Sequence, residues 1–389
     1  MSRRLSPALD RLGTETAFSV LARAKALERA GRPVIHLEIG EPDFDTPAHV
    51  IQAAAEGLAG GMTHYCPSAG IDSLREAAAD YFSRSRDLDV PPERCLVGTG
   101  AKPFIFFTVL ATCGPGDEVV YPNPGFPIYE SAVRFAGAVP VPVPLRDDDD
   151  FVLDPDRLRA ALSRRTKLVI LNSPQNPTGG ALDPDAVDAI ARVLEESEAW
   201  IFSDEVYSQL QYDSPFRSVA STPSLAQRTL VLDGLSKTYA MTGWRCGFAA
   251  VPVDLLEPLV RFFVNSTSCV PPFVQHAGVA ALEGPQESVV EMREAFMRRR
   301  ALVVTGLNAL PGVACSRPAG AFYAFPNVAA LPVSADELAR RLLEDAAVAT
   351  LSGTAFGTEG EGHLRVSYAN SEANITEALS RLGELIAGL

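Results

Sequence analysis

The sequence predicts an α/β fold, with a mainly parallel sheet in a large domain and a second, smaller domain. Short apolar runs alternate with helical stretches from residue 47 to residue 250, the pattern of strands joined by helices. Several of these runs end in a charged or polar residue, at the strand ends where ligands bind in parallel sheets. From Arg317 onward the strand pattern becomes shorter, which indicates the second domain. A chain of 389 residues is long enough for both domains.

The elements of the fold follow in order along the chain. Apolar runs predict the strands, and longer stretches with helical periodicity predict the helices. In the first part the strands are Arg94–Val97, Glu118–Tyr121, Val139–Val143, Lys167–Leu171, Trp200–Ser203, Thr229–Leu232 and Cys246–Ala250, with helices near Pro47–Leu58, Ile71–Arg84, Pro103–Ala111, Asp183–Ser197 and Val289–Leu310. In the last part the segments GAFYAFP and HLRVSYA predict strands, with helices at Ser334–Glu344 and Ser371–Ile386.

Composition excludes several classes of protein. With 47% hydrophobic and 21% charged residues, the chain reads as an ordinary soluble globular protein. Its net charge of −14 argues against nucleic acid or an anionic membrane as a partner. The six cysteines form no C-x-x-C pair and no histidines have zinc-site spacing, so we expect reduced core cysteines, no metal and a cytoplasmic location. We expect no signal peptide, and the longest apolar run, Phe104–Cys113, is too short to span a bilayer.

Four polar residues at strand ends indicate a specific chemistry. Lys237 follows the apolar strand in TLVLDGLSK and Asp204 ends the run AWIFSD, where a charge needs a partner. Asn176 lies in NSPQNPTGG, and Arg245 follows Lys237 by eight positions. An amine nucleophile, a carboxylate, an amide and a guanidinium are the parts needed to hold pyridoxal phosphate. The lysine would form a Schiff base, the aspartate would protonate the pyridine nitrogen, and the arginine would bind the phosphate.

The order of these four residues resembles that of the fold-type I aminotransferases of class I/II, most of all the bacterial aspartate aminotransferases. The resemblance extends from about Thr14 to Leu385. It implies a large domain at 49–285 that binds pyridoxal 5'-phosphate on a mainly parallel seven-stranded sheet flanked by helices. It also implies a small α+β domain at 286–389, against which an N-terminal segment, 1–48, would pack.

The resemblance assigns a phosphate site to the turn in LVGTGAKPF. Gly100 permits a tight turn there, and Ala101 and Lys102 offer backbone N–H groups at the start of a helix, where the dipole favours an anion. Arg245 would complete this site. Tyr65 in THYCPSAG matches a tyrosine that reaches the phosphate of the neighbouring subunit, which implies a homodimer with composite active sites.

Further roles follow from the resemblance around the cofactor ring. Phe126 in NPGFPIY would stack flat on the pyridine. Asn176 and Tyr207 would hydrogen-bond the phenolic oxygen of the cofactor, and Asp204 would keep the ring nitrogen charged. Lys237 would carry the cofactor and then move a proton between the substrate α-carbon and the cofactor, which requires a neutral amine that burial supplies.

The resemblance implies substrate contacts as well. Arg365 in GHLRVSYAN would bind the α-carboxylate bidentately, with Asn176 and the backbone of Gly40 beside it. Lys102 occupies the place where some bacterial aspartate aminotransferases bind a distal carboxylate, although it could lie against the phosphate or point into solvent. Many relatives carry a phosphate-binding serine three residues before the lysine, where this chain has Gly234, and Ser236 cannot be assumed to replace it.

The sequence thus predicts a ping-pong transamination between an L-amino acid, with aspartate, glutamate and aromatic amino acids as candidates, and a 2-oxo acid such as 2-oxoglutarate. An enzyme on the same scaffold could instead catalyse β- or γ-elimination, replacement or carbon–carbon bond formation. A non-catalytic regulatory module on this fold is a further alternative, but it would carry a DNA-binding domain before the resemblance begins. The substrate side chain stays open, because its pocket comes from distant loops, including those around Phe18 and 265–272.

Overall fold

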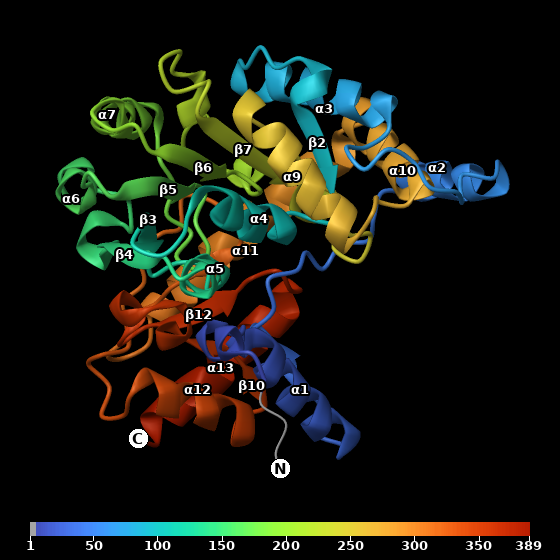
Figure 1. Cartoon of the computed structure of the whole chain (residues 1–389). Coiled ribbons are helices and arrows are strands. Elements are labelled where there is room, and N and C mark those ends of the chain that lie inside the picture. The colour runs from blue at the N-terminus through green and yellow to red at the C-terminus, as the bar shows by residue number, and fades with distance from the viewer. Residues whose placement is uncertain (1–4) are drawn as a thin grey trace.

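A seven-stranded sheet organises the larger part of the molecule, which a computed structural model describes for residues 5–389 (Figure 1). The strand order is β2-β8-β7-β6-β5-β3-β4. Strand β8 runs antiparallel to both neighbours and the other pairs are parallel. All seven predicted strands and the mainly parallel sheet are confirmed. The bounds are β2 Cys95–Gly98, β3 Glu118–Asn123, β4 Val139–Pro144, β5 Thr166–Asn172, β6 Trp200–Asp204, β7 Thr229–Gly234 and β8 Gly247–Ala250.

Helices cover both faces of this sheet, and strand β5 shows how its sequence serves both. Leu168 and Ile170 pack in the cluster that contains the residues of α4, α5 and α9, whereas Val169 and Leu171 pack in the cluster that contains those of α6 and α7. Successive side chains of a strand point to opposite faces, so a strand buried on both must be apolar throughout. The helices are α2 Ala48–Ala59, α3 Asp72–Arg86, α4 Lys102–Thr112, α5 Ile128–Ala136, α6 Pro155–Ala161, α7 Pro184–Glu195, α8 Leu235–Thr238, α9 Val253–Ser266 and α10 Pro272–Glu283.

The last part of the chain forms a smaller layered unit. Strands β9 Tyr323–Ala324, β11 Leu351–Ser352 and β12 Leu364–Ser367 make an antiparallel sheet. Three helices accompany it: α11 Glu287–Asn308, α12 Ala335–Glu344 and α13 Glu372–Ala387. The predicted helices agree with the structure to within a few residues. The helices that were not predicted are α5, α6, α8, α9, α10 and an N-terminal helix, α1 Thr16–Arg29. Helix α9 contains Pro258 and α10 begins at Pro272, which obscures the helical pattern in the sequence.

The N-terminal segment lies against this C-terminal unit (Figure 1). Strand β1 Ile35–His36 pairs in parallel with β10 Val348–Ala349. Helix α1 Thr16–Arg29 buries Ala24 against Leu343 and Ala349. Residues at the two ends of the sequence therefore share one hydrophobic core. The domain boundaries at 48 and 285 stay predictions, and residues 1–4 lie outside the described range.

The structure also shows where the acidic run and the cysteines of the sequence lie. The acidic run begins as a short 3-10 turn, Asp147–Asp149, with exposed side chains. All six cysteines are unpaired. Between residues 5 and 389, no helix is long and apolar enough to cross a membrane, and no group of three or more potential metal ligands comes together.

Candidate active site

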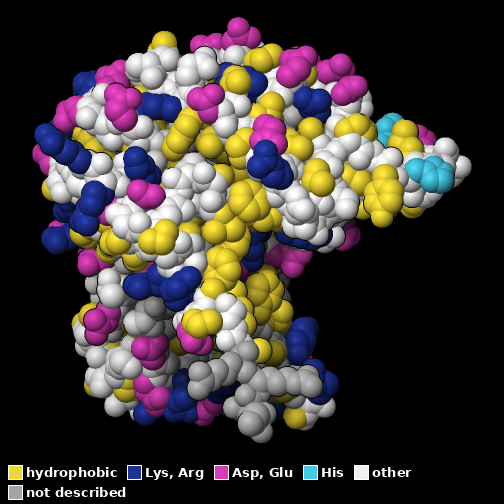
Figure 2. Space-filling model, in the orientation of Figure 1, with side chains coloured by type: hydrophobic (Ala, Val, Ile, Leu, Met, Phe, Trp, Pro, Cys, Tyr) yellow, Lys and Arg dark blue, Asp and Glu magenta, His cyan; other side chains and the backbone are white. Residues whose placement is uncertain are grey.

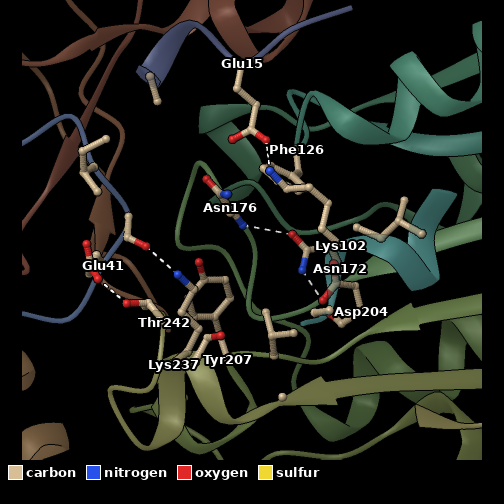
Figure 3. Close-up of a pocket in the computed structure, with 18 of the residues that line it drawn as sticks. Glu15, Glu41, Lys102, Phe126, Asn172, Asn176, Asp204, Tyr207, Lys237 and Thr242 are labelled. Atoms are coloured by element: carbon tan, nitrogen blue, oxygen red, sulfur yellow. Dashed lines mark hydrogen bonds and ion pairs between the residues drawn. The ribbon is translucent and has the colours of Figure 1, made fainter. Parts of the chain in front are cut away.

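A cavity of about 550 Å³ lies where strands β5, β6 and β7 end, next to the C-terminal unit (Figure 3). Its walls come from the N-terminal segment, the loops that follow the sheet strands, and strand β12. This is the edge at which ligands bind in parallel sheets. Ten of the predicted site residues line it: Gly40, Ala101, Lys102, Phe126, Asn176, Asp204, Tyr207, Lys237, Arg245 and Arg365. Gly100 and Tyr65 are not among the lining residues, although Gly100 adjoins Ala101 and Arg245, which are.

Asp204 presents a buried carboxylate that is only half satisfied. It ends β6, and the hydroxyl of Tyr129 donates a hydrogen bond of 2.7 Å to its Oδ2. No residue within 5–389 bonds its Oδ1. Burial raises the pKa of Asp204 to about 6, although the bond from Tyr129 opposes the shift. A buried carboxylate oxygen without a donor fits a protonated ring nitrogen, the group that the sequence assigned to it.

Lys237 supplies an amine that loses its proton more readily than an ordinary lysine. It lies in the single helical turn α8, directly after β7, and its Nζ donates to the carbonyl oxygen of Gly40. Burial lowers the pKa of Lys237 to about 8. Glu41 opposes the shift, while the cations Arg365, Arg245 and Lys102 add to it. An amine with such a pKa is available as a nucleophile and a base near neutral pH.

The predicted phosphate turn is shaped around Arg245. Gly100 has φ +86°, and a Cβ there would lie 2.4 Å from Nη2 of Arg245, so that only glycine suits the position. Ala101 precedes the first turn of α4, whose free N–H groups point outward at that end. At Gly234 no side chain is offered, and a Cβ would approach no atom nearer than 3.4 Å. Ser236 does line the cavity. Free N–H groups and a guanidinium at one place fit a phosphate.

Arg365 is buried in β12 with its guanidinium held from several sides. Its Nη1 donates to Oδ1 of Asn176 at 3.1 Å, and its Nη2 donates to the carbonyl oxygen of Glu38. The guanidinium packs on the rings of Tyr323 and Phe356, 4.7 and 4.8 Å from their centroids. No other residue of the described chain bonds its Nε. A fixed guanidinium with donors to spare fits a substrate carboxylate.

Asn176 and Tyr207 are placed by residues that the sequence did not reveal. Asn172, at the end of β5, accepts from the backbone N–H of Asn176 at 3.0 Å and donates to the carbonyl oxygen of Asp204 at 3.1 Å (Figure 3). The hydroxyl of Tyr207 lies 2.7 Å from that of Tyr323. Tyr323 also explains Gly40, because a Cβ at Gly40 would lie 2.0 Å from its Oη.

Lys102 forms an ion pair with Glu15 at the edge of the cavity (Figure 3). Its Nζ lies 5.7 Å from the ring centroid of Phe18 and 5.6 Å from that of Phe126. Phe18, which the sequence placed near the substrate pocket, does line the cavity, whereas no residue of 265–272 does. Glu15 was not predicted, since a lone acid before a helix carries no signal of its partner 87 residues later.

Tyr65 is 90% exposed, in the connection between α2 and α3. Its predicted partner is the phosphate bound by a second subunit, so its role stays a prediction.

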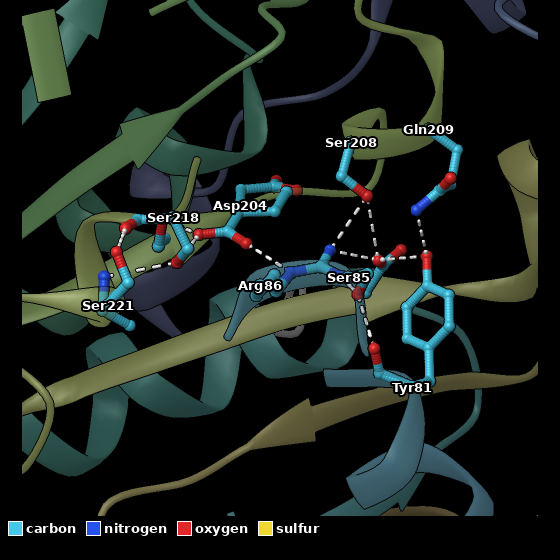
Figure 4. Close-up of polar contacts among 12 residues, drawn as sticks. Tyr81, Ser85, Arg86, Asp204, Ser208, Gln209, Ser218 and Ser221 are labelled. Atoms are coloured by element: carbon cyan, nitrogen blue, oxygen red, sulfur yellow. Dashed lines mark hydrogen bonds and ion pairs between the residues drawn. The ribbon is translucent and has the colours of Figure 1, made fainter. Parts of the chain in front are cut away.

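Beneath the cavity lies a buried polar network that the sequence also did not reveal (Figure 4). Arg86, the last residue of α3, forms ion pairs with Glu205 and Asp233, and its Nη2 donates to Oγ of Ser208 at 2.9 Å. Glu205 follows Asp204 directly, and Asp233 lies at the end of β7, so the network ties together the strand ends that carry the site. In the sequence Arg86 stands in the charged run SRSRD, which reads as a solvated helix end.

Known proteins with similar sequences share this arrangement of the chain. A model of the family described as aminotransferase class I and II matches residues 32–382, a span that contains every predicted site residue but not Glu15. The chain is 40% identical over 389 residues to an aspartate/prephenate aminotransferase of Thermus thermophilus, with 99% of each covered. Among solved structures it resembles an aspartate aminotransferase from Rhizobium meliloti, with TM-score 0.94, 38% identity and 99% of both chains covered. It also resembles an aromatic aminotransferase from Pyrococcus horikoshii, with TM-score 0.89 and 37% identity, over 95% of this chain and 99% of the other.

Proposed function

Because the chain belongs to the class I and II aminotransferases, and is therefore an enzyme of amino-acid transamination, we propose that it works with pyridoxal 5'-phosphate bound in this cavity. The amino group would pass from an L-amino acid to a 2-oxo acid in two half-reactions, with the first product leaving before the second substrate binds. The names of the relatives cover aspartate, prephenate and aromatic substrates, so they do not decide which side chain this enzyme accepts.

The observation that carries the proposal is the pairing of Asp204 with Lys237 in one cavity. Asp204 has a buried carboxylate oxygen without a donor, and Lys237 has an amine whose pKa burial has lowered. A carboxylate that demands a cation and a lysine kept ready to lose its proton are costly features for a mere structural core. Both are required by a pyridinium cofactor that is joined to a lysine.

The residues that would hold the cofactor surround these two. When bound, pyridoxal phosphate withdraws the electron pair left on the substrate α-carbon once its proton is removed. Asp204 would keep the proton on the ring nitrogen, and Phe126 would cover one face of the ring. Asn176 and Tyr207 would donate to the phenolic oxygen. The turn Gly100–Ala101 and the guanidinium of Arg245 would bind the phosphate.

The chain's own residues then perform the proton transfer. Arg365 would fix the substrate α-carboxylate, which sets the orientation of the α-carbon. Lys237 would take the α-proton as a general base and deliver it as a general acid to the cofactor carbon that carried the aldehyde, and its lowered pKa suits both roles near neutral pH. The carbonyl oxygen of Gly40, which accepts from Lys237 Nζ, would keep the amine in place between the two steps.

We also propose that two copies form the active enzyme. Tyr65 is almost wholly exposed, and Ile51, Leu58 and Met62 are also exposed large hydrophobic residues. Figure 2 shows hydrophobic side chains gathered in a band from the region of α4 and α9 down toward α1. A second subunit would cover such surface and bring Tyr65 to the neighbouring phosphate. The six unpaired cysteines support a reducing cytoplasmic location.

A single-turnover experiment tests the proposed function. The purified enzyme is loaded with pyridoxal phosphate and mixed with one L-amino acid at a time, without acceptor. We expect the cofactor absorbance to change to that of the amine form, with one matching 2-oxo acid released for each site. Release of ammonia, or of a product with an altered carbon skeleton, would instead favour elimination or bond formation. Borohydride reduction followed by peptide mapping should place the cofactor on Lys237, and a label on another lysine would refute that assignment.

A further inference from the structure

The ion pair between Glu15 and Lys102 changes the chemistry of one wall of the cavity. Lys102 would be the natural cation for a substrate with a second carboxylate, yet its ammonium already contacts a carboxylate of the same chain. The side chain of Glu15 is only 15% exposed, compared with 42% for Lys102. A pair in which the acid is the better shielded partner is not a loose surface contact.

Glu15 is committed to this contact by its position. It is the N-cap residue of α1, but its side chain makes no capping hydrogen bond and turns to Lys102 instead. Together with Phe126 and Arg365 it also lines a small recess beside the main cavity. A substrate whose α-carboxylate is held by Arg365 would therefore lie close to Glu15.

Beside the guanidinium of Arg365, aromatic and aliphatic side chains make up part of the cavity wall. The rings of Phe18 and Phe126 flank Lys102 Nζ, and Ile39 and Ile105 also line the cavity. Phe18 is 59% exposed in the chain without a substrate. An apolar or aromatic substrate side chain would cover this ring and remove its surface from water.

We propose that Glu15 is a specificity-determining residue of this enzyme. By neutralising Lys102 it makes the side-chain wall of the cavity select donors with uncharged, apolar or aromatic side chains over dicarboxylic donors. This inference rests on the proposed function. It extends to the acceptor, so that a neutral 2-oxo acid should serve better than the 2-oxoglutarate that the sequence suggested.

The physical reason is that a dicarboxylic substrate would gain no net ion pair by binding Lys102. A distal carboxylate can reach Lys102 only by displacing the carboxylate of Glu15, which replaces one ion pair with another and leaves two like charges close together. An uncharged side chain leaves the Glu15–Lys102 pair intact and gains only apolar contact. The selection therefore works by excluding the charged substrate.

Half-reaction kinetics test this with L-phenylalanine and L-aspartate as donors, followed by cofactor absorbance without acceptor. The unmodified enzyme should have the higher specificity constant for phenylalanine. Glu15→Gln frees Lys102 and should raise the ratio of aspartate to phenylalanine constants by about tenfold to a hundredfold, the value of a charge-assisted hydrogen bond. The double variant Glu15→Gln/Lys102→Met should lose that gain.

A matched control separates the ion pair from the mere loss of a negative charge. Glu41 also lines the cavity, but its carboxylate accepts from Thr242 and makes no contact with Lys102. Glu41→Gln should leave the donor ratio unaltered, whatever it does to the overall rate. An equal shift of the ratio in Glu41→Gln and Glu15→Gln would overturn the role of Glu15.

A binding measurement supplies a readout that does not depend on turnover. Calorimetric titration of the loaded enzyme with succinate and with butyrate, which differ by one carboxylate, should show tighter succinate binding only after Glu15→Gln. If the unmodified enzyme prefers aspartate and succinate and Glu15→Gln does not alter either ratio, the inference fails while the proposed function stands. If no amino acid of any class converts the cofactor, the proposed function itself fails.

Discussion

At the scale of single residues, the charged groups of the cavity differ in how completely their charge is compensated. Asp204 has one donor, Tyr129, for two buried oxygens. Lys237 has a carbonyl acceptor, while its nearby charges are mostly cations. The pKa of Asp204 is therefore raised, and a protonated cofactor nitrogen beside it would lower it again. The pKa of Lys237 is lowered, which makes the neutral amine available for bonding to the cofactor.

The lowered pKa of Lys237 predicts a pH dependence of cofactor capture. An aldehyde reacts with the neutral amine, so the rate at which the apoprotein captures pyridoxal phosphate should rise about tenfold per pH unit below pH 8 and level off above it. Stopped-flow absorbance measures this capture rate across a range of about pH 6.5 to 10. A rate still rising steeply near pH 10 would indicate an ordinary exposed lysine.

The lowered pKa of Lys237 also makes the stability of the apoprotein depend on pH. The folded pKa of about 8 lies below the ordinary value of 10.5, so the unfolded chain holds the proton more tightly. The free energy of unfolding of the apoprotein should therefore increase as the pH rises from about 8 toward 10.5, and Lys237→Met should remove that increase.

Tyr129→Phe is the sharpest test of how Asp204 is supported. Without the hydroxyl, both carboxylate oxygens lack a donor, which favours the protonated acid and weakens its hold on the cofactor nitrogen. The single-turnover rate should fall by roughly tenfold to a hundredfold, because a hydrogen bond to a charged group contributes about 1.5–3 kcal/mol. Tyr121→Phe is the matched control, since its hydroxyl bonds Glu130 at 2.8 Å outside the cavity. Similar losses in both variants would point to general damage to the fold.

At the scale of elements, strand register brings the site together. Asn172 and Asp204 are register partners at the ends of β5 and β6, and Gly234 ends β7 beside them. The sequence could predict this edge because each strand is an apolar run that stops at a polar residue. It could not predict Tyr129, Asn172 or Tyr323 as supports, because each acts through a partner that only the folded chain brings near. Glu15 was missed for the same reason, because its partner Lys102 comes near only in the folded chain.

The buried network below the strand ends predicts a large effect on stability. Arg86→Met would leave Glu205 and Asp233 buried without their cation, at a cost of about 3–5 kcal/mol in the free energy of unfolding. Burial raises the pKa of both acids, so they would protonate more readily in the variant, and the loss should be smaller at pH 5 than at pH 8. Urea unfolding at the two pH values measures this. Arg84→Met, on the same helix but exposed, should cost little, and equal losses would contradict the assignment.

At the scale of the whole molecule, the proposed composite site predicts complementation between two inactive variants. Lys237→Ala lacks the amine and Tyr65→Ala lacks the residue offered to the neighbouring site. Mixed dimers would contain one site with both defects and one with neither. After joint unfolding and refolding of equal amounts, activity at limiting cofactor should return to about a quarter of the unmodified value. No recovery, or an active monomer on sedimentation, would reject the composite site.

The pairing of β1 with β10 joins the beginning of the chain to its end, and this has a mechanical consequence. Glu15, Gly40 and Arg365 all lie on or beside elements of that joined body, whereas Lys237 and Asp204 are anchored in the large sheet. The groups proposed to bind the substrate α-carboxylate thus belong to the joined body together with Glu15, whereas Lys102 and the two groups proposed to act on the cofactor and substrate belong to the large sheet domain. If the joined body moves relative to the large sheet, Glu15, Gly40 and Arg365 would move together. A substrate that fits poorly at one of these residues would then keep all three from their closed positions relative to Lys237.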